Sequence, residues 1–550
     1  MRLVLFYGLW FISCILRRFV TLFCMKPVSS PFLLFAGSGL LPIVGCGFYA
    51  CWVAVWGQIP FFWDNVLLGS KYADHFYQNG WGNFLLPLPI DAGHPLLFAY
   101  YLALQWKVFG KTLWVSHLAV LPFLWGIVWA YWGIAKRLLH GYGLAAALLL
   151  LLADPALLAQ SIVGGADVAL LCFFLWAVYG VISGNRRLVA LMLPLLCLVS
   201  LRGMILCAGI GIGHLLLYPH AKQQSWWARL TGLLPYYIPA LLVSAGWLLY
   251  HYHHTGFLVE NHTYRHWWHH YQKAGILFMV KNAIVCIWRL IDQGRVYMYV
   301  VTGGCLVYLW RQNRKSSPPA PPQRSGEFTY GNDRQDSTNG LCSLSRWLEG
   351  ILTPFSAAQK QYMALVFTLL LCFLPFLVFR QMPLMHRYFM PFYALVIPVF
   401  LLLTGKVMSP KGVKPITLGA VVFLISGHFW LYPSPIANGW DATLACLPYF
   451  AAKNAANKYI IQQGIPPQQI CTEFPMVSGA RHTHLTEVNN LQLTAFTNQT
   501  LQTCNYVLYA NVSNDFNAKE LTLLYSDFIP IASFNHLWIT MQLYQKKKPD

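Results

Sequence analysis

The ionisable residues that could do chemistry in this sequence are few, and several lie between residues 61 and 110. Asp64, Asp74, Asp91 and His94 all belong to this stretch, although only 18 of the 550 residues are Asp or Glu. Carboxylates and histidine are side chains that bind polar groups and move protons near neutral pH. Their concentration makes this stretch the first candidate for a reaction centre.

Two shorter segments also carry charge between apolar runs. One extends from Asp154 to Asp167, and the other surrounds Arg387 in the sequence MHRYFMP. Asp154 precedes a proline and is expected to be a turn residue. Asp167 begins an apolar run, where an acidic residue is also a common helix cap. Arg387 can bind a phosphate through its guanidinium, or it can reach lipid headgroups from a membrane interface.

A third segment is rich in histidine. Residues 251–270 contain seven histidines, and His266, His269 and His270 have the spacing of one helical face. With Glu260 nearby, this face could hold a divalent metal, whereas ordinary histidines at a wet membrane boundary are the alternative. The run lacks an HExxH signature. The sequence thus requires no cofactor and leaves open whether a divalent metal binds. Arg265 in the same run is a candidate ligand for a lipid phosphate.

The composition indicates which elements must position these residues. The chain is 57% hydrophobic and 10% charged, with a mean hydropathy of +0.48, which is too little polar surface for a soluble globule of this length. Repeated apolar runs predict an α-helical polytopic membrane protein. The net charge of +20 fits Lys and Arg retained in cytoplasmic loops, and no nucleic-acid-binding signature accompanies it.

After a basic lead-in over residues 1–30, about 11 crossings are predicted, with the N-terminus inside and the C-terminus outside. The spans cover residues 31–57, 112–135, 141–153, 167–183, 230–250, 295–310, 361–379, 388–404 and 416–432, together with a re-entering pair at 188–201 and 203–218. Residues 275–292 are expected to lie along the surface. This arrangement puts the clusters of Lys and Arg on one side of the membrane.

The remaining segments differ in composition. Residues 311–360 are rich in Ser, Pro and Gly and predict a disordered cytoplasmic linker. Residues 433–550 alternate a helical stretch with short strand-like runs and predict a small external α/β domain. Cys446, Cys471 and Cys504 lie in this tail, so one disulfide is expected there if the tail is outside the cytoplasm, without the spacing showing which pair forms.

With this topology, the charged segments open on the same, non-cytoplasmic face, within external loops 58–111 and 251–294 and near Asp167 and Arg387. A transporter more often places its ionisable groups near the middle of the bilayer, on broken helices. Clustering at one interface favours a site that binds a lipid headgroup and a water-exposed group at the same time.

The order of these segments resembles a known family. WDN at residues 63–65, followed by DAGHPLLFAYYLALQWKVFG, resembles the first external loop of the GT-C membrane glycosyltransferases of the family 39 type, which include protein O-mannosyltransferases and lipid A aminoarabinose transferases. ADPALLAQSIVGGADVALLCF and HRYFMPFYAL resemble the second acidic element and the Arg-Tyr-Pro element of that family. The resemblance spans most of residues 31–432, which would form the catalytic domain. Asn65 stands where the family usually has Glu, and Leu96 where it has a second Pro, which leaves the substrate subgroup open.

The resemblance implies roles for individual residues. Asp64 would be the general base, with helix capping as its alternative. Arg387, His94 and Arg265 would bind the donor phosphate. A second set, which would orient the substrate, consists of Asp167, Asp91 and Asp74.

The function implied is inverting transfer of a sugar from a polyprenyl phosphate to a glycan, lipid or protein acceptor at the external face, in a bacterial inner membrane or the endoplasmic reticulum. Neither the sugar nor the acceptor is indicated. The alternatives are a flippase or transporter of a lipid-linked or envelope component, a scaffold of envelope assembly, and a polysaccharide ligase or polymerase. A flippase predicts ionisable residues deep in the spans, and a scaffold predicts that Asp64 and Arg387 are replaceable.

Overall fold

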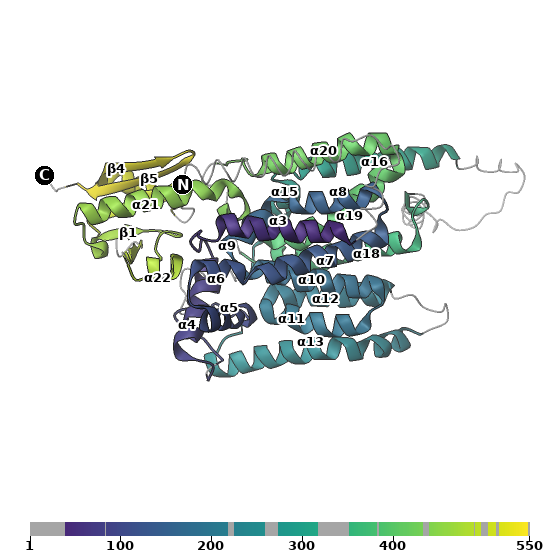
Figure 1. Ribbon diagram of the computed structural model, residues 1–550, viewed down its shortest axis with the longest axis horizontal. Coiled ribbons are helices and arrows are strands. Elements are labelled where there is room, and N and C mark those ends of the chain that lie inside the picture. The colour runs from purple at the N-terminus through teal and green to yellow at the C-terminus, as the bar shows by residue number, and fades with distance from the viewer. Residues whose placement is uncertain are drawn as a thin grey trace, which may run out of the picture.

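Figure 1 shows the computed structural model of the protein, a bundle of roughly parallel helices with a small domain at one end. The structure describes residues 39–82, 84–217, 225–258, 273–316, 351–381, 384–432, 439–488, 490–496, 504–512, 516 and 518–547. The predicted lead-in over residues 1–30 and the central part of the predicted linker, residues 317–350, lie outside these ranges. The ends of that linker are helical, since residues 311–316 belong to α16 (Val296–Ser316) and residues 357–360 to α18 (Ala357–Val378). The expected fold class, a helical membrane body with a small C-terminal α/β domain, is confirmed.

The helices of the body follow the predicted apolar runs closely. They are α3 (Leu40–Trp56), α7 (Leu121–Leu138), α8 (Tyr142–Leu152), α10 (Ala166–Ser183), α11 (Arg186–Val199), α12 (Leu201–Leu217), α13 (Trp226–Thr255), α15 (Ile276–Ile291), α16 (Val296–Ser316), α18 (Ala357–Val378), α19 (Met390–Val407) and α20 (Pro410–Gly427). The buried core is centred on α8, α10 and α19, most of whose residues are buried, and on the inner face of α7. By contrast, α13 runs along one edge of the bundle, with most of its residues exposed (Figure 1).

Among the described residues, five helical segments are long and apolar enough to cross a membrane. They are Leu113–Leu138, Ala166–Ser183, Trp226–Thr255, Ala357–Val378 and His386–Val407. A sixth crossing is obtained if α8 and α9 (Pro155–Val163), which bend by 52° at their junction, form one broken span. The protein is thus an integral membrane protein by the length and composition of its helices. The expected number of crossings, and the surface position of residues 275–292, stay predictions.

Close helix packing in the core depends on small residues at two positions of α7. A Cβ added at Gly126 would lie 2.5 Å from Cys172 Sγ, and one added at Gly133 would lie 2.6 Å from the ring of Tyr179. Both neighbours belong to α10, and the two glycines are seven residues apart, on the same face of α7. Glycine at these positions therefore lets α7 and α10 approach closely, as small residues commonly do in membrane helix pairs.

The first external loop also contains helices, both directly after Trp63, where Asp64 was a candidate helix cap, and further along the loop. It contains η1 (Val66–Lys71), α4 (Tyr72–Asn79) and α5 (Leu97–Phe109), and α6 (Leu113–Leu118) leads from it into α7. Figure 1 places α4, α5 and the C-terminal domain at the same end of the bundle. The loop thus forms a folded layer over one end of the helices.

Basic residues gather at the opposite end. Lys406 at the end of α19 lies over the ring of Phe355, and Lys414 in α20 lies over Tyr142 at the start of α8. The side chain of Gln359, in the first turn of α18, donates to the carbonyl oxygen of Leu138 at the end of α7. The helix ends that carry Lys136, Arg137, Lys406 and Lys414 are therefore neighbours, as the positive-inside pattern requires.

The C-terminal domain begins with η3 (Trp440–Ala442), η4 (Leu444–Cys446) and α21 (Leu447–Gln462). Its five-stranded sheet has the order β2-β1-β3-β5-β4, made of β1 (Ile470–Thr472), β2 (Thr494–Ala495), β3 (Tyr506–Ala510), β4 (Phe528–His536) and β5 (Ile539–Lys546). The short elements η5 (Pro467–Gln469), α22 (Ala480–Thr483) and α23 (Ala518–Asp527) connect the strands. Four of the five strands were predicted from the sequence, and the two-residue β2 was missed.

The tail contains one disulfide, as expected. It joins Cys471 in β1 to Cys504, two residues before β3, while Cys446 is free and buried. Since β1 and β3 are adjacent parallel strands, the disulfide reinforces a contact that the sheet already makes. The presence of a disulfide is typical of a compartment outside the cytoplasm.

Candidate active site

Arg387 is the centre of a cluster of charged side chains. It belongs to a short 3-10 helix, η2 (His386–Phe389), that leads into α19, and its side chain is only 2% exposed. The guanidinium contacts Asp64 Oδ2, lies 3.1 Å from Asp441 Oδ2 and lies 3.6 Å from Asp167 Oδ2. A buried guanidinium needs such partners, because an unpaired charge inside a protein is costly.

Asp64 is the most accessible carboxylate of this cluster, with a side chain that is 17% exposed. It follows Trp63, whose φ of +57° lies in the left-handed region, and its backbone carbonyl accepts hydrogen bonds from Leu67 and Leu68. The turn holds the carboxylate against Arg387. In the described structure the cap position of η1 is Asn65, and no side-chain capping bond is present there. The capping alternative for Asp64 is therefore not what the geometry shows.

Asn65 occupies the place where the family resemblance suggested Glu, and the structure gives it a packing role. It is 3% exposed and lies against Gly165, where an added Cβ would be 2.4 Å from its Oδ1. The first external loop and the start of α10 therefore touch through an amide and a glycine. A carboxylate at residue 65 would add a further negative charge beside Asp64 and Asp167.

Asp167 lies in the first turn of α10, with Gly165 at the cap position and no side-chain capping bond. Its Oδ1 accepts a hydrogen bond of 2.5 Å from Arg202, at the start of α12. The Arg202 guanidinium also stacks over the ring of Tyr388, 4.3 Å from its centroid. Arg202 was missed in the sequence, although an arginine between two apolar helices is the kind of signal that marks a functional cation.

Asp167, Arg202 and Arg387 border a hollow between the first external loop, α10 and α12. Its polar lining includes His94, Asp167, Arg202 and Arg387, and its apolar lining includes Phe98. Two guanidiniums and one imidazole on the same wall provide the hydrogen-bond donors that a phosphate binds.

His94 is held in a form that can donate or accept one hydrogen bond. Burial and the nearby positive charge of Arg202 lower the pKa of His94 to about 4, so that the ring is neutral at pH 7. Its Nδ1 has no hydrogen-bond partner among the described residues. A neutral imidazole facing two guanidiniums avoids charge repulsion and leaves one nitrogen for a ligand.

Asp441 was not predicted as a site residue, and it comes from the start of the C-terminal domain. It is fully buried, and Gln160 in α9 donates to both its backbone oxygen and its Oδ2. Burial raises the pKa of Asp441 to about 6 despite the opposing effect of Arg387. The only sequence signal was an acidic residue in GWDATLAC, in a segment poor in other charge.

The structure does not bring Asp91 into the lining of this hollow. Its Oδ2 lies 2.9 Å from His251 Nε2, and its Oδ1 accepts from the backbone of Gly93. Both side chains of this pair are almost completely buried. The pair fastens the first external loop to the end of α13 and orients the segment that carries His94.

Asp74 lies elsewhere in the loop. Its carboxylate contacts Lys111 at 2.7 Å and Arg481 of α22 at 3.4 Å. Gln78 donates to both of its oxygens. Asp74 therefore ties the first loop to the C-terminal domain and is not brought together with Asp64.

Three other predictions concern residues away from the hollow. Arg265, His266, His269, His270 and Glu260 lie outside the described residues, and elsewhere in the described chain no group of three His, Cys, Asp or Glu side chains is placed to hold a metal. Asp154 caps α9, accepting from the backbone of Ala156 and Leu157. The Arg295 guanidinium also donates two hydrogen bonds of 2.9 Å to its carboxylate.

Two solved structures are similar to the chain over most of its length. One is the crystal structure of ArnT from Cupriavidus metallidurans bound to undecaprenyl phosphate, with 11% identity and a TM-score of 0.49, covering 91% of this chain and 97% of that chain. The other is ArnT from the same organism in the apo state, with 12% identity and a TM-score of 0.48, covering 91% and 98%. No protein-family model and no curated protein matches the sequence.

Proposed function

We propose that this chain is a membrane glycosyltransferase of the GT-C type, which transfers a sugar from a polyprenyl phosphate donor to an acceptor at the external face of the membrane. The observation that carries the proposal is the contact between Asp64 and Arg387, beside a hollow that Arg202 and His94 also line. One accessible carboxylate next to a set of phosphate-binding donors is what transfer from a sugar phosphate needs.

The donor phosphate binds to Arg202 and Arg387, with a hydrogen bond from His94. Arg387 then exchanges one of its carboxylate partners for the phosphate, which releases Asp64 for the acceptor. Because Asp167 and Asp441 remain bound to the two arginines, the guanidiniums stay oriented while Asp64 is freed. Fixed positive charge at this position stabilises the negative charge that develops on the leaving phosphate.

In the chemical step, the acceptor hydroxyl or amine gives its proton to Asp64 as its oxygen or nitrogen attacks the anomeric carbon. The bond between this carbon and the phosphate oxygen breaks, and its electron pair leaves with polyprenyl phosphate. Attack and departure on opposite faces of the sugar invert the configuration at that carbon. A correctly positioned general base contributes roughly 10²–10⁴-fold to such a rate.

The membrane body suits a donor of this kind. A prenyl chain reaches a site at the membrane surface sideways, from the bilayer, and the helices that frame the hollow are apolar over their length. The basic helix ends lie away from the hollow, and the disulfide lies in the domain next to it. Both features support an external, periplasmic site if the cell is bacterial.

The proposal is tested with the purified full chain in lipid nanodiscs, given membrane-extracted polyprenyl phosphate sugars labelled in the sugar. We expect the label to move to a new product and an equal amount of polyprenyl phosphate to be released. Movement of intact donor across sealed proteoliposomes without release of polyprenyl phosphate would instead support the flippase alternative. Neither release nor movement, in a folded protein that binds none of the donors, would contradict both.

A further inference from the structure

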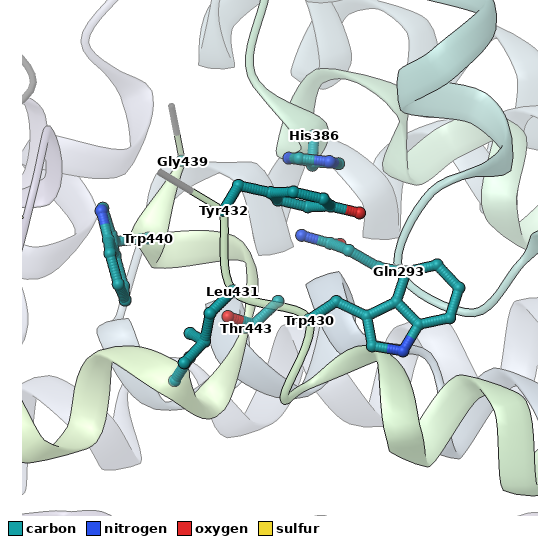
Figure 2. Close-up of a pocket in the computed structure, with 9 residues that line it drawn as sticks. Gln293, His386, Trp430, Leu431, Tyr432, Gly439, Trp440 and Thr443 are labelled. Atoms are coloured by element: carbon teal, nitrogen blue, oxygen red, sulfur yellow. The ribbon is translucent and has the colours of Figure 1, made fainter. Parts of the chain in front are cut away.

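A second hollow lies near Asp441, between the helical body and the start of the C-terminal domain. Its main lining residues are Gln293, His386, Trp430, Tyr432, Trp440 and Thr443 (Figure 2). The hollow thus combines three aromatic rings with three groups that donate or accept hydrogen bonds, and nothing in the mechanism above uses it.

One wall of this hollow is held in a strained conformation. Gln293 has a φ of +53°, although it is not glycine, and the following Gly294 has a φ of +83°. A Cβ at Gly294 would lie 1.9 Å from the carbonyl oxygen of Phe423, so the turn is pressed against α20. The side-chain oxygen of Gln293 accepts from Arg295, which leaves its amide nitrogen for the hollow. Strain of this kind is often found at ligand sites.

The charges around this hollow are already paired within the described structure. Asp292 accepts hydrogen bonds from Tyr432 at 2.5 Å and lies 2.7 Å from His386. Arg289 lies 3.1 Å from the ring of His386 and donates to the carbonyl oxygen of Leu384. The hollow therefore presents no unpaired charge from these groups, which disfavours a phosphate or a carboxylate as its occupant.

The aromatic residues give the hollow flat apolar surfaces. Trp430 and Tyr432 are partly exposed, whereas Trp440 is 8% exposed and its indole N–H has no partner among the described residues. Figure 2 shows the Tyr432 ring between His386 and Gln293, with Trp440 and Trp430 on either side. Aromatic faces alongside amide, hydroxyl and imidazole groups suit a ligand with C–H faces and neutral hydroxyl groups.

The hollow also adjoins the proposed reaction centre. A Cβ built on Gly439 would lie 3.5 Å from His386 Nδ1 and 3.8 Å from Asp441 Oδ1, so these two side chains converge at one point of the lining. Asp441 in turn lies 3.1 Å from Arg387. A ligand in the hollow would therefore lie next to Asp441, one of the carboxylates that hold Arg387.

We propose that this second hollow binds a neutral saccharide and that, given the proposed transferase function, this saccharide is the part of the acceptor next to the reacting group. The indole of Trp430 stacks on the sugar, while Gln293 and Thr443 exchange hydrogen bonds with its hydroxyl groups. The reaction centre is thereby flanked by a phosphate-binding hollow and a saccharide-binding hollow.

The experiment measures binding to the full chain in nanodiscs by saturation-transfer NMR. The probes are neutral disaccharides built from glucose, galactose, mannose or N-acetylglucosamine, with a glucuronic acid disaccharide as the acidic comparison. At least one neutral probe should bind wild type, and its affinity should fall at least about fivefold in Trp430→Ala and in Gln293→Ala. Trp227→Ala, which removes an exposed tryptophan at the start of α13, is the matched control and should bind as wild type does.

Absence of binding by every neutral probe, preference for the acidic probe, or equal binding by wild type and both hollow variants would overturn the proposal. Undecaprenyl phosphate binding is measured on the same samples, and retained binding shows that each variant is folded at the reaction centre. Saccharide binding in a protein that releases no polyprenyl phosphate would contradict the proposed transferase function while supporting the saccharide site. The two proposals therefore fail separately.

Discussion

The carboxylate of Asp441, at the start of the C-terminal domain, lies 3.1 Å from the guanidinium of Arg387, at the start of α19. This pair joins the external domain directly to the charge cluster of the membrane body. Since Asp441 is fully buried, the domain does not merely cover the site from outside. It supplies one of the three carboxylates that hold Arg387 in place.

The ionisation of Asp441 should be visible as a pH dependence of stability. Its pKa is about 6 in the folded protein and 3.8 ordinarily, so between these pH values the folded state binds more protons than the unfolded state. The free energy of unfolding contributed by this group therefore falls as pH rises from about 4 to 6, by about 3 kcal/mol. Asp441→Asn cannot ionise and lacks this contribution.

Thermal unfolding of wild type and Asp441→Asn in nanodiscs, between pH 4.5 and 7.5, measures the effect. The melting temperature of the variant minus that of wild type should increase across this range, because only wild type must ionise a buried carboxyl. A difference that stays constant with pH would show that Asp441 is ionised throughout and that Arg387 fully offsets its burial.

Arg202 should be required for binding the donor phosphate. Arg202→Ala removes a guanidinium that lines the first hollow, and loss of a charge-assisted hydrogen bond typically costs about 1.5–3 kcal/mol. The Kd for undecaprenyl phosphate should then rise by roughly 10- to 100-fold. Arg186→Ala removes an equal charge at the start of α11 and should leave the Kd unchanged. An equal effect of both substitutions would mean that only the net charge of the protein matters.

Asp74 should matter for stability and not for the reaction. Its nearly buried carboxylate joins Lys111 to the C-terminal domain through Arg481, and removing its charge leaves Lys111 poorly paired. We expect Asp74→Asn to lose about 1–3 kcal/mol of unfolding free energy, with no change in the rate of sugar transfer. A normal melting temperature combined with a large loss of kcat would instead show that Asp74 orients the substrate.

The disulfide should stabilise the C-terminal domain in particular. Cys471 and Cys504 close a loop with a sequence separation of 33, for which about 2–4 kcal/mol is typical. Cys504→Ser should therefore make the strands β1 to β5 more susceptible to protease, with little change in the helical body. Cys51→Ser, at an exposed free cysteine of α3, is the control. Equal protease resistance of the two variants would show that the sheet alone holds the domain together.

Much of the fold could be predicted from the sequence, because the helices coincide with apolar runs. The run at residues 361–379 corresponds to α18 (Ala357–Val378), and the strand-like run at 506–510 is β3 (Tyr506–Ala510). The helices α4 and α5 were missed, because α4 has mixed polar and aromatic residues and the 13-residue apolar run of α5 is shorter than a membrane span. The short helix α9 was interpreted as a turn since Pro155 and two glycines bound it.

The candidate site was predictable only in part. Asp64, Asp167, His94 and Arg387 were found because carboxylates and cations are rare in this chain and these four occur in segments with a family resemblance. Asp441 could not be found in this way, since its role depends on a fold in which the start of the tail packs against α9. Pairing through tertiary contacts likewise separates Asp74 and Asp91 from the hollow, although their sequence context is the same as that of Asp64.

The central claim is that Asp64 takes the proton of the acceptor. The most direct test compares wild type with Asp64→Asn in single-turnover transfer, with the Kd for undecaprenyl phosphate measured on both proteins. Asn keeps the size and a hydrogen-bonding group but cannot accept the proton, so we predict at least a 100-fold slower transfer with a Kd within a few-fold of wild type. Transfer by Asp64→Asn at the wild-type rate would contradict the assignment of Asp64 as the base.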